Sequence, residues 1–336
     1  MMLSLLKWSN LLLVLLSLVT LLAPYANPVY FWPLSITGLF FPWFLLLHLV
    51  FIGFWIYRKH WYFVFSLGWI IMNWNHFDSL VGFSTSSPSS ESLSALSLNC
   101  HSFISPDTNK GPNAKEWEKL IEEIKDIDFL FFQEFPRKGR YPGSGSAVAK
   151  KLFARHWPYQ YTTNGGRLAM LSKYPLSGKK VDYFDGAANG YMMATAKVAD
   201  KKIRLINIHL QSNRITGMAD DLDAKNIQEK ETLGKIVEML RRYKNASIKR
   251  AKQSREIAAV IGKNSNLLIL GGDFNDTPLS YAYYSIDKQL RDGFRAKGSG
   301  IGTTYLGKLP GLRIDYIFFG KGLFIDTYRH RKTPFS

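Results

Sequence analysis

Long apolar runs dominate the start of the chain. Residues 3–23 and 34–57 are almost wholly apolar, with Lys7 and His48 as their basic interruptions. At a rise of about 1.5 Å per residue, each run is long enough as a helix to cross a hydrocarbon core of about 30 Å. A third, shorter stretch at 61–83 ends in several polar residues. We expect it to span as well, and the alternative is a helix that lies on the membrane interface.

Beyond residue 93 the pattern changes to short apolar runs that alternate with longer amphipathic stretches. The short runs are typical of buried strands, whereas apolar positions that recur every three or four residues predict helices. The sequence predicts strands at 94–99, 129–133, 168–172, 191–198, 203–209, 267–270 and 313–319, and helices at 114–126, 147–157 and 222–262. This alternation predicts an α/β fold, a layered α/β sandwich of two packed sheets flanked by helices.

These patterns divide the chain into three parts. Residues 1–83 are expected to form an all-α transmembrane anchor of two to three helices, built from the candidate spans above. Residues 84–93 are polar and Ser-rich, which predicts a flexible linker, and residues 94–336 form a globular domain. The first run also fits a cleaved signal peptide, but the second long apolar run favours a retained anchor. We therefore expect an integral membrane protein.

Charge is distributed as unevenly as hydrophobicity. Among Asp, Glu, Lys and Arg, residues 1–83 contain Lys7, Arg58, Lys59 and Asp78, so +15 of the formal net charge of +17 lies beyond them. So basic a domain favours polyanionic partners, although a merely solvated surface is the alternative. Basic residues beside membrane spans stay in the cytoplasm. The domain then lies outside the cytoplasm with three spans and inside it with two.

The predicted helix at 222–262 concentrates part of this charge, because Lys and Arg are spread all around it. A solvated helix face explains such residues. The sharper alternative is a basic arm that touches nucleic acid or the membrane surface.

Polar side chains stand at the ends of several predicted strands, where α/β sheets collect ligands. Asp315 is a carboxylate inside an apolar strand, and a buried carboxylate is costly unless it is paired or binds a cation. Carboxylate and amide oxygens suit Mg²⁺, and no Cys/His cluster has the spacing of a zinc site. Taken singly, each residue fits an ordinary structural role such as a turn. The candidate positions are Asn99, Glu134, His209, Asp273, Asn275 and Asp315.

Five short motifs follow one another in the order of a known family. They are Leu-Asn (98–99), Phe-Gln-Glu (132–134), Asn-Ile-His-Leu (207–210), Gly-Asp-Phe-Asn-Asp (272–276) and Arg-Ile-Asp-Tyr-Ile-Phe (313–318). The series resembles the endonuclease/exonuclease/phosphatase (DNase I-like) superfamily over residues 94–336. Each motif is weak alone, but five in the family's order favour this fold. The resemblance implies a metal-dependent hydrolase of phosphoester bonds, either a phosphodiesterase or nuclease or a lipid phosphodiesterase.

The resemblance also implies a role at each matching position. Glu134 would bind Mg²⁺, with Mn²⁺ as a substitute, and Asn99 would lie close to the metal and its waters. His209 would contact the scissile phosphate and donate a proton to it. Asp273 would orient or deprotonate the attacking water, and Asn275 would hold a phosphate oxygen. Charge that develops on the phosphoryl group requires such preorganised donors and a cation.

The C-terminus departs from the family pattern. There the family carries a Ser-Asp-His motif, whose His pairs with the carboxylate that matches Asp315. This chain stops at Ser336, where that Ser would stand, and His330 lies too early to replace the His. We expect the domain to be truncated just before Asp-His. The alternative is a catalytically impaired, membrane-tethered module that binds polyanions.

The motifs narrow the reaction better than the substrate. Residues 312–316 do not match the Trp-x-Asp-Arg stretch typical of the family's inositol phosphatases, and Phe-Pro-Arg at 135–137 does not clearly match its exonuclease III-like enzymes. Membrane attachment and basic charge are compatible with nucleic acid or a phospholipid headgroup as the phosphoester substrate. The sequence predicts no oligomeric state.

Overall fold

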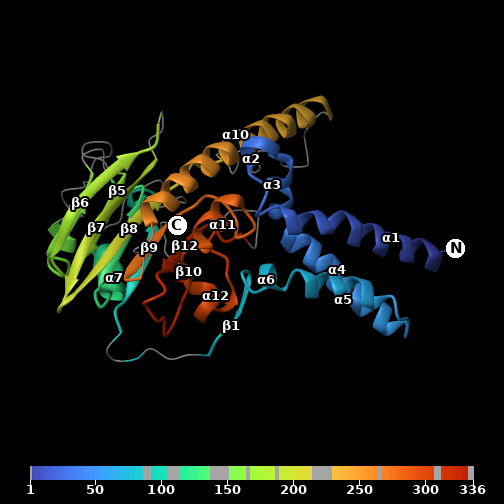
Figure 1. The fold of residues 1–336 in the computed structure, drawn as a ribbon, viewed down its shortest axis with the longest axis horizontal. Helices are drawn as coiled ribbons and strands as arrows, with labels where there is room; N and C mark the ends of the chain where they lie inside the picture. Colours follow the sequence, from blue (N-terminus) through green and yellow to red (C-terminus); the bar gives the residue numbers. More distant parts are fainter. Residues whose placement is uncertain are drawn as a thin grey trace.

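The computed structural model joins a bundle of apolar helices to a two-sheet globular domain (Figure 1). The residues that the structure describes are 2–85, 89, 92–104, 114–136, 151–163, 167–185, 189–213, 229–262, 266–305 and 312–331. Within these ranges, every strand predicted from the sequence is present and its bounds shift by a few residues at most.

Ten strands form the two large sheets of the globular domain. The six-stranded sheet has the order β10 (Arg291–Asp292), β12 (Asp315–Phe319), β9 (Leu268–Asp273), β8 (Lys201–His209), β7 (Gly190–Val198) and β6 (Leu176–Tyr183). The four-stranded sheet has the order β2 (Ala95–Asn99), β3 (Phe129–Gln133), β5 (Leu168–Ser172) and β4 (Tyr159–Thr162). The pairs β2–β3 and β8–β9 are parallel, so their carboxyl ends meet at one edge of the domain.

The two sheets pack face to face, and β3 shows how. All of its residues are buried. Phe129 and Phe131 lie in the cluster between the sheets, whereas Leu130 and Phe132 lie in the cluster beneath the covering helix. Because successive strand residues point to opposite faces, a strand covered on both sides is mostly apolar, and a polar residue in it, such as Gln133, needs buried hydrogen-bond partners.

Helices cover the outer faces of both sheets, which completes the predicted layers. On the four-stranded sheet, α7 (Ala114–Ile124) buries Trp117 and neighbouring apolar residues. On the six-stranded sheet, the C-terminal part of α10 (Glu229–Ile261) and α11 (Tyr281–Asp287) bury apolar residues. The predicted α/β sandwich of two packed sheets flanked by helices is therefore confirmed.

Some elements were predicted only in part. The helix predicted at 147–157 includes helical residues 151–154, and residues 147–150 lie outside the described ranges. Residues 222–228 of the helix predicted at 222–262 also lie outside the described ranges, and α10 covers the rest of that prediction. The strands β4 and β6 were not predicted, because both are sheet edges: β4 is mostly half-buried and β6 is largely exposed, and neither forms an apolar run.

The N-terminal region contains two long apolar helical stretches, Met2–Leu22 and Pro33–Tyr57, and both are able to cross a membrane by length and composition. The first consists of α1 (Met2–Ser17) and a short 3-10 segment. The second consists of α3 (Pro33–Thr37), another 3-10 segment and α4 (Phe41–Tyr57). Between them, α2 (Pro28–Phe31) begins at the Asn27–Pro28 break.

The third predicted span, 61–83, is not a single helix. Its helix α5 (Phe63–Met72) ends at Asn73, and at about 1.5 Å per residue it covers about half of a 30 Å core. After α6 (Trp74–Phe77), the chain forms β1 (Val81–Phe83), which pairs with β11 (Ser299–Ile301) of the globular domain. The end of this segment was misassigned because its strand partner is distant in sequence.

The helical region packs directly on the globular domain. Leu279 joins the apolar cluster formed by α4 and α5. The hydroxyl of Tyr243 donates to the backbone oxygen of Ser35 over 2.7 Å. The buried guanidinium of Arg313 donates to the backbone oxygen of Ser79 over 3.1 Å. These contacts fix the two regions relative to each other, whereas the predicted linker 84–93 lies partly outside the described residues.

Candidate functional site

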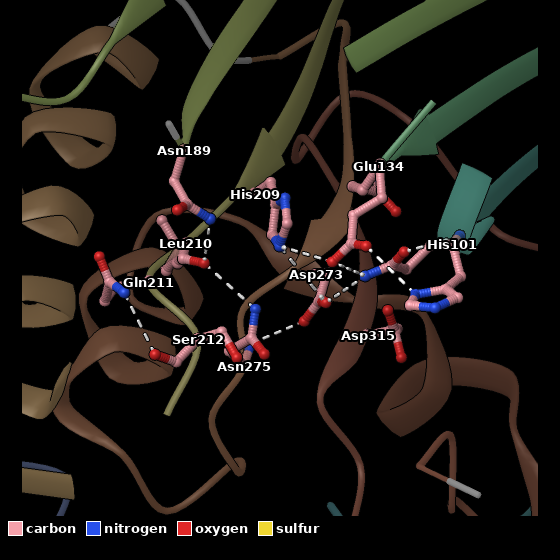
Figure 2. Close-up of polar contacts among 12 residues, drawn as sticks. His101, Glu134, Asn189, His209, Leu210, Gln211, Ser212, Asp273, Asn275 and Asp315 are labelled. Carbon is pink, nitrogen blue, oxygen red and sulfur yellow. Dashed lines mark hydrogen bonds and ion pairs between the residues drawn. The ribbon is translucent and has the colours of Figure 1, made fainter. Parts of the chain in front are cut away.

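The six predicted site residues converge at the edge where the parallel strands end: Figure 2 labels five of them, and the sixth, Asn99, hydrogen-bonds to Glu134 and Asp273. His209 and Asp273 are register partners at the ends of β8 and β9. Asp273 is also the partner of Asp315 on β12. Asn99 ends β2 in the facing sheet, and Glu134 follows the end of β3 beside it.

The carboxamide of Asn99 links the two sheets at this edge. Its Nδ2 donates to Glu134 Oε1 over 3.3 Å and to Asp273 Oδ2 over 3.0 Å. The first bond stays within the four-stranded sheet and the second crosses to the six-stranded sheet. One amide therefore brings the two carboxylates to the same point.

His209 faces both carboxylates. Its Nε2 lies 3.9 Å from Glu134 Oε1 and 3.8 Å from Asp273 Oδ2, with 5% of the side chain exposed. In the part of the chain that the structure describes, this nitrogen has no hydrogen-bond partner. An unpaired buried nitrogen between two carboxylates is well placed for a ligand that inserts between them.

Asp273 and Asn275 form a tight turn at the end of β9. Asp273 Oδ1 accepts a hydrogen bond from the backbone N–H of Asn275 over 2.7 Å. The Asn275 side chain donates to the backbone oxygen of Leu210 over 3.1 Å, so its amide hydrogens point to the β8 end. To hold a phosphate oxygen, as predicted, this amide would have to exchange that bond for one to the ligand.

An unusual backbone conformation sets the direction of two site side chains. Glu134 and Asn275 follow the ends of β3 and β9 with φ of +51° and +52°. This left-handed region is unfavourable for most side chains, and Asn tolerates it better than Glu. In both places the turn directs a polar side chain back across the strand ends, and strain of this kind clusters at functional sites.

The two central carboxylates have opposite electrostatic environments. A hydrogen bond from His101, the charge of His209 and the Asn99 amide lower the pKa of Glu134 to about 2, against the effect of burial. Burial raises the pKa of Asp273, although His209, Asn99 and a backbone N–H oppose it. Glu134 is therefore held as an anion, and Asp273 is a stronger base than an exposed Asp.

Asp315 lies behind Asp273 and lacks a full set of partners. Burial and the charge of Asp273 raise the pKa of Asp315 well above its usual range. Its Oδ1 is buried without a hydrogen-bond partner among the described residues. His330 is not that partner, because its ring packs against Phe294 and Tyr328. The expected truncation, just before an Asp-His that would follow Ser336, stays a prediction, and residues 332–336 lie outside the described ranges.

His101 was not predicted as a site residue. Its Nδ1 lies 3.3 Å from Glu134 Oε2, and its side chain is 60% exposed. His101, Ser102 and Phe103 all have positive φ, so an unusual left-handed turn holds the ring against Glu134. Its position two residues after Asn99 was the available signal.

Gln133 and Asn207 were also missed as site residues, although both stand inside the quoted motifs. Gln133 Nε2 donates to Asn207 Oδ1 over 2.7 Å, and both residues are fully buried. Asn207 Nδ2 donates to the backbone oxygens of Phe132 and Ala169 over 3.0 and 2.9 Å. These bonds connect β8 to β3 and β5, and so hold the sheets in register beneath the site.

The Gly-Gly pair before Asp273 is explained by crowding. A Cβ on Gly271 would lie 2.6 Å from the ring of Phe131, and one on Gly272 would lie 2.3 Å from the backbone oxygen of Ile208. Only glycine permits this approach, which brings Asp273 close to the facing sheet.

The oxygen donors of the site fit a hydrated Mg²⁺ better than a metal held by many side chains. Within the described ranges, no group of three or more His, Cys, Asp or Glu side chains surrounds one cation position. Mg²⁺ needs only one or two carboxylates and keeps several waters. Glu134 offers an anionic, partly exposed carboxylate. Asn99 turns its nitrogen toward Glu134, and rotation of the carboxamide presents its oxygen instead.

Comparison with known proteins follows the same division of the chain. The model of the Endonuclease/Exonuclease/phosphatase family matches residues 96–333. The model of a domain of unknown function matches residues 3–80. A search of curated proteins found no match.

Several solved structures are similar to the chain at low sequence identity. SmcL is 19% identical with a TM-score of 0.47, over 72% of this chain and 86% of SmcL. Sphingomyelinase C from Streptomyces griseocarneus is 17% identical with a TM-score of 0.43, over 72% of this chain and 86% of the enzyme. Truncated Caenorhabditis elegans TDP2 is 16% identical with a TM-score of 0.45, over 74% of this chain and 88% of that protein. The match of the family model to most of the globular domain shows that this chain belongs to the endonuclease/exonuclease/phosphatase family.

Proposed function

We propose that this protein is a Mg²⁺-dependent phosphodiester hydrolase that is tethered to a membrane. The family acts on phosphoester bonds, and the proposal adds the metal, the bond type and the tether. The observation that carries it is the junction at Asn99, whose single amide contacts both Glu134 and Asp273. A histidine with an unpaired buried nitrogen faces the same two carboxylates.

Each residue then has a distinct task in hydrolysis. Asp273, whose pKa is raised by burial, orients the attacking water and accepts its proton. His209 Nε2 donates a hydrogen bond to a non-bridging phosphate oxygen and stabilises the charge that develops there. Glu134 holds the cation, with Asn99 beside it. When bound, Mg²⁺ would supply positive charge that offsets the negative charge of the phosphate as the deprotonating water attacks it.

The helix arrangement supports an extracytoplasmic domain. Lys7 Nζ lies 5.0 Å from the ring centroid of Tyr62, so the start of α1 and the turn after α4 share one end of the bundle. That end also contains Arg58 and Lys59, and it points away from the globular domain (Figure 1). From this basic end the chain returns to the domain through α5 and residues 73–80. The proposal counts this return as the third crossing, although α5 alone is shorter than a full span. Since basic flanks remain in the cytoplasm, the domain then faces the other side of the membrane.

Membrane sidedness is testable with two engineered cysteines. Cys100 is buried, so an impermeant maleimide should not label the native chain in intact cells. Asp200→Cys on the exposed β7–β8 turn should be labelled, whereas Tyr57→Cys should require lysis. Labelling of Tyr57→Cys alone in intact cells would reverse the proposed orientation.

Activity is tested with the full chain in detergent or nanodiscs. The panel contains plasmid DNA, abasic DNA, RNA, sphingomyelin and phosphoinositides, each with Mg²⁺ and with excess chelator. We expect metal-dependent cleavage of a nucleic acid or a phospholipid headgroup. The Asp273→Asn protein, purified in parallel, controls for contaminating hydrolases.

The same panel can reject the proposal. Cleavage that persists in chelator would exclude the metal, and equal cleavage by Asp273→Asn would exclude this site. A folded protein that binds these polyanions without cleaving any of them would favour the alternative function, a membrane-tethered binding module.

A further inference from the structure

The N-terminal half of α10 exposes an apolar stripe. Leu233, Ile236, Val237 and Leu240 recur at the three- and four-residue spacing of one helix face, and they are 63%, 42%, 63% and 40% exposed. A soluble helix normally buries such a stripe against its own domain. Here the stripe faces outward over four successive apolar positions.

The remainder of the same helix shows the contrast. From Tyr243 onward, residues such as Ile257 and Ile261 are buried in the domain core. The helix therefore extends past the surface of the sheet that it covers. The first turns of α10 contribute no residue to the core cluster, and an exposed apolar stripe of this kind marks a contact site for another partner.

Basic side chains lie in the same turns as the exposed stripe. At about 100° per residue, Lys235 and Arg242 lie on the opposite face of the helix and Arg241 lies at the margin of the stripe. Glu238 pairs with both arginines over 2.7 Å. An apolar face opposite a polar face rich in Lys and Arg is the composition of helices that lie in the interface of anionic membranes. A helix that binds nucleic acid needs the charge but not the apolar stripe.

The stripe also lies beside the ends of the proposed membrane spans. Tyr243 donates to Ser35 of α3, and Lys244 Nζ lies 5.8 Å from the ring centroid of Trp32. In Figure 1 the free end of α10 runs past α2 and projects beyond it. Tyr30 and Phe31 of α2 are themselves 84% and 55% exposed. Exposed apolar and aromatic residues thus continue from α2 onto α10.

We propose that the N-terminal half of α10 is an interfacial helix, whose stripe enters the headgroup region of a bilayer that contains anionic lipid. The proposal rests on the membrane tether proposed above. It commits to lipid because the stripe is continuous with the span ends and because the polar face of the same turns carries Lys and Arg. A second copy of the chain would explain the apolar residues but not this position beside the spans.

One consequence concerns the candidate site. Further along the same helix, the buried Arg250 donates to Asp276, to Gln211 O and to Asn213. Those partners lie next to Asp273 and His209 in the chain. At about 1.5 Å per residue, Arg250 is roughly 20 Å from Val237 along the helix. A single rigid element therefore holds the site at a fixed distance from the bilayer.

The test uses the full chain in nanodiscs that contain one copy each, with spin labels on Val237→Cys and on the control Lys252→Cys. Lys252 is exposed on the same helix, away from the stripe. In discs with phosphatidylglycerol, collisions with oxygen should exceed those with a water-soluble nickel chelate several-fold at Val237, and the reverse should hold at Lys252. In discs of pure phosphatidylcholine, the excess of oxygen collisions over nickel-chelate collisions at Val237 should become smaller.

Other outcomes overturn the proposal in separable ways. If the nickel chelate collided with the label at Val237 as often as with the label at Lys252, the interfacial helix would be rejected. Protection from both reagents would indicate a protein contact and reject lipid as the occupant. An equal ratio of oxygen to nickel-chelate collisions at Val237 in both lipids would reject the role of anionic lipid. Flotation of the chain with vesicles measures the tether independently, so its failure would reject the tether and not merely the helix.

Discussion

His209 and Asp273 are register partners at the ends of parallel strands, and His209 Nε2 lies 3.8 Å from Asp273 Oδ2. Parallel pairing is what allows this, because it brings the carboxyl ends of β8 and β9 to the same edge. Both side chains are almost fully buried. The site thus begins as a property of backbone register and is completed by the facing sheet.

Replacement of Asp273 by Asn should abolish turnover and leave the fold intact. Burial raises the pKa of Asp273, so a neutral amide of similar shape removes an unfavourable buried charge. Loss of the base should lower kcat roughly 10²–10⁴-fold. Steady-state kinetics and thermal unfolding measure the two effects, with the exposed Asp200→Asn as the matched control. Activity within a few-fold of wild type would remove Asp273 from the mechanism.

Replacement of Glu134 by Gln should lower the affinity of the site for Mg²⁺ and leave the fold intact. The carboxylate is held as an anion, with its pKa lowered to about 2 by His101 and its other neighbours. Without that charge, the Mg²⁺ concentration for half-maximal activity should rise by more than about tenfold, since oxygen anions dominate Mg²⁺ binding. Metal titrations of the variant and of the exposed Glu118→Gln control decide this. An identical titration curve would assign the cation elsewhere.

Sequence patterns predicted the elements whose burial is complete. Phe129–Gln133 could be recognised as a strand because both of its faces are covered, so that every position is apolar or locked in place. The polar residues that follow such strands stood out for the same reason. Glu134 and Asp273 were identified in this way, and the structure brings them to one point through Asn99.

Other features depend on contacts between distant parts of the chain. The strand β1 exists because it pairs with β11, a partner that no local pattern reveals. The exposed edge strand β6 has too few buried positions to produce a periodic signal. The bond between Gln133 and Asn207 requires the two sheets to meet face to face. Such residues look like ordinary polar positions until the packing is known.

Loss of the Asn207 side chain should destabilise the domain. Asn207→Ala removes the bonds that its amide donates to the backbone oxygens of Phe132 and Ala169, whereas Gln133 Nε2 keeps longer bonds to Ser97 and to the Phe131 backbone. Each group left unsatisfied costs about 1–3 kcal/mol, so we expect a total loss of about 3 kcal/mol. For a domain of this size that lowers the midpoint of thermal unfolding by roughly 6–12 °C. Intrinsic fluorescence can follow this, with the exposed Asn245→Ala as control, and an unchanged midpoint would show that water replaces the amide.

His330 should make the fold sensitive to mild acid. Burial and the charge of Arg313 lower the pKa of His330 from its ordinary 6.5 to about 4. Between those pH values the unfolded chain binds a proton that the folded chain excludes, so stability is lost as the pH falls from 6.5 toward 4. Replacement by Phe suits the neighbouring rings of Phe294 and Tyr328 and removes the titrating group.

We therefore expect the unfolding midpoint of His330→Phe to depend less on pH than that of wild type between pH 6.5 and 4, and to match it more closely above pH 7. The exposed neighbour Arg329→Gln should retain the wild-type slope, which separates titration of the imidazole from a general change in surface charge. Parallel slopes for wild type and His330→Phe would mean that the imidazole is solvated when protonated. In that case the packing of the 323–331 segment against α12 (Gly293–Lys297) must open below pH 6.5, because His330 Nε2 has no hydrogen-bond partner among the described residues to offset the hydration that a charged ring loses there.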